Sequence, residues 1–165
     1  MSKHRRGKPL ERKWVSAVQR TVNHVVKGFY DSEPSQRTGL RVLELIEENW
    51  TALPSFFESH FRYYEVLLKT TDHLLQGLLP NRDHPSIVME KEKEHLSEPV
   101  MVWNSKTCLL RTYQVEIPCD VKDLQQVQCL NICETLPDVL EVFHVLSGRT
   151  TQIPLKHHSP RKCIV

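Results

Sequence analysis

The chain has 165 residues, of which 39% are hydrophobic and 25% charged, and its formal net charge is +2. These values are typical of one globular domain with tails, and they exclude a wholly disordered protein. No apolar run reaches the roughly 18–20 residues of a membrane helix, and no secretory signal pattern follows the basic N-terminus. We therefore expect a protein of the nucleus, the cytoplasm or both, with its five cysteines as thiols.

Residues 1–8 are predicted to form a disordered basic arm. Positive charge is concentrated in and just after this arm, at Arg5, Arg6, Lys8, Arg12 and Lys13. A cluster of this kind serves either as a nuclear-import signal or as a contact to the phosphates of a nucleic acid. The import or solvated arm is favoured, because nucleic-acid modules usually add a basic face with interleaved aromatic side chains inside the fold.

Residues 9–80 are predicted to form a helical bundle. Its three helices are expected over about 10–29, 35–53 and 54–79. The valines of the first helix follow a three–four spacing, and Pro9 stands in the first turn, where its missing N–H costs nothing. The connections are short, which favours antiparallel neighbours in a bundle.

The third predicted helix carries the strongest pattern of the chain, an apolar seam with a strict four–three spacing. The seam consists of Phe57, Phe61, Tyr64, Leu68, Thr71, Leu75 and Leu78. A helix with such a stripe must cover it with another helix, as in a coiled coil. The seam therefore predicts packing within the bundle or against a partner.

A charged linker is predicted over residues 81–98, and a small mixed α/β module over residues 99–155. Expected in the module are a strand near 113–117, a helix over about 120–135, and strands over about 139–146 and 150–155. The expected fold class is thus mainly α: an N-terminal three-helix, coiled-coil-like bundle followed by a β-α-β-β-like C-terminal module. The tail, residues 156–165, is predicted to be basic and disordered.

No catalytic, cofactor-binding or metal-binding motif stands out. Cys129 and Cys133 would share one face of a helix, but structural zinc sites use tighter spacings and need a second pair of ligands. Buried core thiols are the better interpretation of this pair, with zinc as the weaker alternative. No glycine-rich phosphate loop or nucleophile–base pair is evident either, so we expect a non-enzymatic protein without cofactors.

One modification pattern lies in the basic tail. Ser159 precedes Pro160, with Arg161 and Lys162 after it, and this order is typical of a proline-directed phosphorylation site. A phosphate there would oppose the positive charge of the tail and weaken a contact to an anion.

The pattern of apolar residues indicates a subunit or adaptor of an intracellular multi-protein complex. The apolar surface is wider than a narrow seam uses, because it also includes Trp14, Trp50, Phe56 and Phe57. A second apolar stripe can therefore face a partner. The expected partner is another helical protein, in a hetero-complex or a homodimer. No contact with a membrane is expected. Candidate partner-binding residues are Phe56, Phe57, Phe61, Tyr64 and Leu68. The alternative is a nucleic-acid-associated protein whose basic arm and tail contact phosphates.

Overall fold

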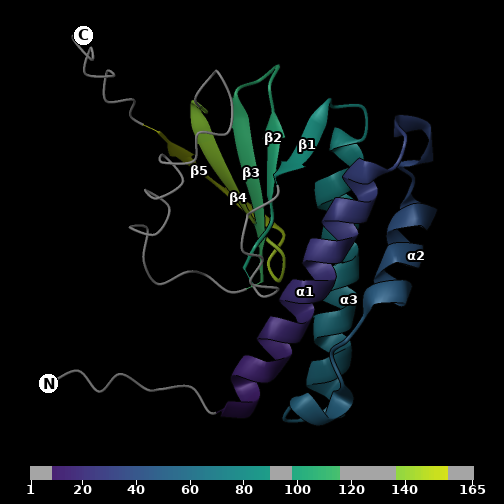
Figure 1. Ribbon diagram of the computed structural model, residues 1–165. Helices are drawn as coiled ribbons and strands as arrows, with labels where there is room; N and C mark the ends of the chain where they lie inside the picture. The colour runs from purple at the N-terminus through teal and green to yellow at the C-terminus, as the bar shows by residue number, and fades with distance from the viewer. Residues whose placement is uncertain (1–8, 90–97, 116–136, 156–165) are drawn as a thin grey trace, which may run out of the picture.

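Helices and then strands follow one another along the chain (Figure 1). The computed structural model describes residues 9–89, 98–115 and 137–155. The α-helices are α1 (Pro9–Asp31), α2 (Gly39–Asn49) and α3 (His60–Leu78). The strands are β1 (Ser86–Met89), β2 (Met101–Asn104), β3 (Leu109–Gln114), β4 (Val139–His144) and β5 (Arg149–Pro154). Short 3₁₀ turns lie at Pro34–Gln36, Pro54–Phe56 and Leu79–Asn81.

The five strands form one mixed sheet in the order β1-β2-β3-β4-β5. All neighbours are antiparallel except β3 and β4, which run parallel with Arg111 opposite Glu141 and Tyr113 opposite Phe143. Antiparallel neighbours can be joined by a tight hairpin, whereas parallel neighbours need a crossover connection of a dozen or more residues. Here most of that connection, residues 116–136, lies outside the described residues.

The helices all lie on one side of the sheet (Figure 1). α1 and α3 are next to the sheet, and α2 packs against them on the side away from it. The core between helices and sheet includes Val18, Val22, Val25 and Phe29 of α1, Leu74 and Leu78 of α3, and Val102, Tyr113 and Phe143 of the strands. Alternate residues of the strands form a second buried cluster on the other face, with Met101, Trp103, Leu110, Leu140 and Val142.

The expected fold class is wrong in its C-terminal part. A five-stranded mixed sheet follows the helices, not a small β-α-β-β unit, so the protein is not mainly α with a minor appendage. The strands expected over about 139–146 and 150–155 match β4 and β5, and the one expected near 113–117 overlaps the end of β3. β2 escaped the period-two search because both of its faces are buried, which makes it read as the continuous apolar run Met101–Trp103. β1 stands inside the segment predicted to be a linker. The helix expected over 120–135 lies outside the described residues.

Two helices begin later than the sequence predicts. Thr38, not Ser35, caps α2, because its hydroxyl accepts a hydrogen bond from the backbone N–H of Arg41 at 3.2 Å. Ser59 caps α3 in the same way, accepting from the N–H of Arg62 at 3.2 Å, while Pro54 opens only a 3₁₀ turn. In both cases the helix starts where a side-chain oxygen satisfies an otherwise unpaired N–H group.

Candidate functional site

Exposed apolar side chains gather on α2, α3 and the segment that joins them. Among the described residues, Ile87 of β1 is the one large hydrophobic side chain that is exposed outside this region. Those inside it are Leu40, Leu43, Leu53, Phe61, Tyr64 and Leu68, which we call the outer stripe. Phe61 is 79% exposed, Leu68 69% and Tyr64 58%. Single exposed apolar residues are ordinary on a soluble protein, but a group of them marks a candidate contact surface.

The two helices bring the parts of this stripe onto one side of the molecule. α2 runs antiparallel to α3, since Gly39 at its start lies against Leu75, and Trp50 after its end donates an indole N–H to the Tyr63 hydroxyl at 3.2 Å. Leu43 is one turn from Gly39, and Leu68 is two turns from Leu75, so each lies on the side of its helix that borders the other. Leu43 and Leu68 therefore flank the same helix–helix boundary.

The predicted seam of α3 is not the face that the core uses. The buried positions of α3 are Val66, Thr70, Leu74, Gly77 and Leu78, so the seam contributes only its last residue to them. The inner face includes Thr70 and Gly77, which no search for apolar residues selects. The face opposite it carries Phe61, Tyr64 and Leu68.

The five predicted partner-binding residues divide into two groups. Phe56 and Phe57 are half-buried and pack against the main core, and Phe57 stacks on Trp14 with ring centroids 5.2 Å apart. Phe61, Tyr64 and Leu68 are exposed and remain candidates for contact. Sequence reasoning missed Leu40, Leu43 and Leu53 as contact residues. The signal for the two in α2 is the crowding of apolar residues at positions 40, 42, 43, 45 and 46, which is more than one helix face can bury.

The cationic side chains beside the outer stripe are all paired with carboxylates. Arg41 pairs with Glu44 at 3.3 Å and with Glu48 at 3.6 Å on α2. On α3, Glu65 pairs with both Arg62 and Lys69 at 2.7 Å. Hydrogen bonds from Lys69 and Arg62 hold the pKa of the Glu65 carboxyl below its ordinary range. Exposed pairs add little stability, but they leave these cations already neutralised.

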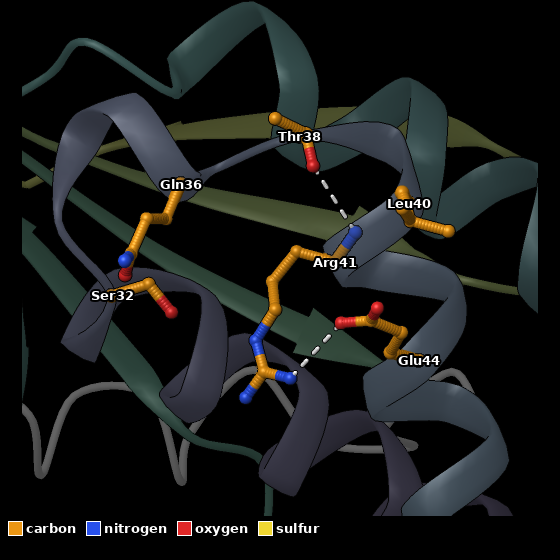
Figure 2. A pocket seen from close by; sticks show the side chains of 6 residues that line it. All are labelled: Ser32, Gln36, Thr38, Leu40, Arg41 and Glu44. Carbon is orange, nitrogen blue, oxygen red and sulfur yellow. Dashed lines mark hydrogen bonds and ion pairs between the residues drawn. The ribbon is translucent and has the colours of Figure 1, made fainter.

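A shallow hollow of about 460 Å³ borders the stripe at Leu40. Figure 2 shows its lining side chains, which are Ser32, Gln36, Thr38, Leu40, Arg41 and Glu44. Arg41 crosses the hollow toward Glu44, and the Thr38 hydroxyl caps α2. Because its charged groups pair with each other, the hollow offers a ligand only hydroxyl and amide groups.

A polar cluster lies inside the protein, between α3 and the sheet. Arg111 and Glu141 form an ion pair across the parallel strands, and Arg111 also donates to the Gly77 carbonyl at 3.3 Å. The Tyr113 hydroxyl donates to the same carbonyl at 3.5 Å and lies 3.4 Å from the Tyr30 hydroxyl. The cavity beside Arg111 holds only about 10 Å³, room for one water molecule. This cluster has no space for a substrate and is a structural element.

Stability is expected to fall as the pH rises above about 10, the ordinary pKa of tyrosine. Burial raises the pKa of Tyr30 and of Tyr113, so the folded chain keeps both protons at a pH where the unfolded chain loses them. Their contribution is complete below about pH 10 and is lost as the pH rises toward the raised pKa values. Urea unfolding between about pH 8 and pH 11 measures it. A decline of equal steepness in a Tyr30→Phe/Tyr113→Phe variant contradicts this origin.

Several of the predicted site residues lie outside the described part of the chain. Arg5, Arg6, Lys8, Ser159 and the pair Cys129 and Cys133 are not among the described residues; Arg12 is described only in its backbone, and Lys13 is exposed near the start of α1. The described residues hold no group of three His, Cys, Asp or Glu side chains placed to share a metal ion. None of the described helices has the length and apolarity of a membrane span.

No protein-family model, curated protein or solved structure matches this chain. The outer stripe is thus identified as the candidate site from its own geometry.

Proposed function

We propose that the protein is a non-enzymatic interaction subunit or adaptor of an intracellular multi-protein complex, and that the outer stripe binds an amphipathic helix of another protein. The observation that supports this is the gathering of exposed apolar side chains on α2, α3 and the segment that joins them. A partner helix that lays its apolar face on two antiparallel helices removes those side chains from water, which is the main favourable term in such complexes.

Exchange of Phe61 for alanine is expected to change the free energy of unfolding of the isolated chain by no more than about 0.5 kcal/mol, because the ring is exposed. The matched control is Leu74→Ala on the inner face of the same helix. Leu74 is fully buried, so its truncation should cost about 2–5 kcal/mol. Urea unfolding of both variants measures the difference. A cost for Phe61→Ala close to that of Leu74→Ala would place the ring in the core and remove it from the candidate surface.

The function itself is tested by co-purification of the full chain from cells under conditions that preserve stoichiometric complexes. A Phe61→Glu/Leu68→Glu variant should lose a partner that the native chain retains, because both substitutions place charge in the apolar contact. Ile87→Glu is the control, since Ile87 is 60% exposed but lies on β1, away from the outer stripe. Equal recovery of the partner with both variants would contradict a role for the stripe.

A further inference from the structure

From the start of α2 to the end of α3, carboxylates outnumber cations. Between residues 39 and 78, the Arg and Lys side chains are Arg41, Arg62 and Lys69, and the carboxylates are Glu44, Glu47, Glu48, Glu58, Glu65 and Asp72. Every one of the cations is held in an ion pair with a carboxylate of its own helix. Within the described part of the chain, this leaves Glu47, Glu58 and Asp72 without a cationic partner.

These three carboxylates lie next to the apolar side chains of the stripe. Glu47 is four residues after Leu43 on α2, and Asp72 is four residues after Leu68 on α3, so each lies one turn along the same side of its helix. Glu58 is exposed just before α3, within one turn of Phe61. Asp72 accepts a hydrogen bond from Gln76, a neutral group that leaves its charge in place. The apolar stripe therefore has a negatively charged border.

From this border we infer the chemistry of the partner: a helix whose apolar face is edged by Lys or Arg, and not a second copy of this chain. The inference rests on the proposed function and specifies its ligand. Two copies joined through the same stripe would bring like-charged borders together, which opposes association. A helix with basic edges pairs with Glu47, Glu58 and Asp72 instead, so charge selects the partner while apolar burial supplies affinity.

The test uses the full chain and two synthetic helical peptides of about 21 residues, or three heptads. Both carry the same leucine face; one has lysine at the edge positions and the other has glutamate. Fluorescence anisotropy should show binding of the lysine-edged peptide at least about tenfold tighter at low salt, with a smaller ratio as salt screens the border. In parallel, sedimentation should show that the chain alone stays monomeric at low salt.

Three variants make the result specific. Glu47→Gln/Glu58→Gln/Asp72→Asn removes the charge with little change of shape, and should bind the two peptides alike. Asp138→Asn removes an exposed carboxylate just before β4, on the sheet and not on the helices of the stripe, and should keep the native preference. Leu68→Glu should abolish binding at the stripe; any binding that survives it belongs to another part of the chain, such as the basic arm.

The outcomes separate this inference from the proposed function. Equal affinity of the native chain for both peptides, or a dimer that is disrupted by Leu68→Glu, overturns the inferred partner but keeps the stripe as a binding surface. If neither peptide shows binding that Leu68→Glu removes, and the chain stays monomeric, the proposed function fails as well. Both are supported if the native chain prefers the lysine-edged peptide, Glu47→Gln/Glu58→Gln/Asp72→Asn loses that preference, and Leu68→Glu loses the binding itself.

Discussion

Exchange of Glu141 for leucine is expected to lower the free energy of unfolding by about 3–5 kcal/mol. Glu141 and Arg111 are an ion pair between β3 and β4, and their side chains are only 7% and 17% exposed. Leucine fills a volume similar to that of glutamate, so the main effect is a buried guanidinium left without its carboxylate. The Gly77 carbonyl, which also accepts from Arg111, cannot replace a negative charge. Equilibrium unfolding in urea measures the loss.

The matched control is the double variant Arg111→Leu/Glu141→Leu. It removes both charges at once, and we expect it to be more stable than Glu141→Leu, because no unpaired charge remains in the interior. Gln152, which donates to Glu141 at 3.0 Å, lies at the exposed edge and can turn to water. A double variant no more stable than the single one would show that the pair does not act through its buried charge.

Truncation of Phe143 to alanine is expected to cost about 3–5 kcal/mol, because it opens a cavity at the contact between α3 and the sheet. The Phe143 ring packs beside Tyr113, with ring centroids 5.6 Å apart, and lies against Gly77. A Cβ atom added at Gly77 would come within 2.9 Å of this ring. Thermal or urea unfolding of the full chain gives the cost.

A double-mutant cycle tests whether Gly77 and Phe143 fit each other. Gly77→Ala alone should destabilise by about 1–3 kcal/mol through overcrowding. In a Phe143→Leu background the same change should cost clearly less, because the ring that the new methyl group meets is gone. Additive costs would show that the glycine is required for another reason, such as the position of its carbonyl group under Arg111 and Tyr113.

The helices could be predicted from the sequence better than the surfaces they use. The three–four spacing of Val18, Val22 and Val25 predicts the inner face of α1, and all three are fully buried. On α3 the apolar pattern points to the wrong side. Close packing of α3 against Phe143 of the sheet requires a residue without a side chain at Gly77, and periodicity does not reveal this requirement. Phe61 and Leu68 are apolar but exposed, so hydrophobicity alone cannot tell core from contact surface.

The sheet and its ion pair left weaker traces in the sequence. Arg111 and Glu141 are 30 residues apart and meet only because β3 and β4 pair in parallel. No local pattern encodes that pairing. β1 is short and lies at an edge, so it shows no clear alternation, whereas β5 is mostly polar but could be predicted from the tight turn that precedes it. The carboxylates Glu44, Glu47 and Glu48 of α2, by contrast, are plain in the sequence, but their relation to Leu43 requires the placement of the helix.

The parallel pairing of β3 with β4 has a consequence for the speed of folding. β1, β2 and β3 form one antiparallel series and β4 with β5 forms another, and within the described part of the sheet the two meet only along the β3–β4 ladder. Hairpins form within about 1–10 μs, but joining these two pieces must first close a long loop, whose entropy opposes the step until the ladder forms. We therefore expect the encounter of the two pieces, and not the formation of either hairpin, to set the folding rate.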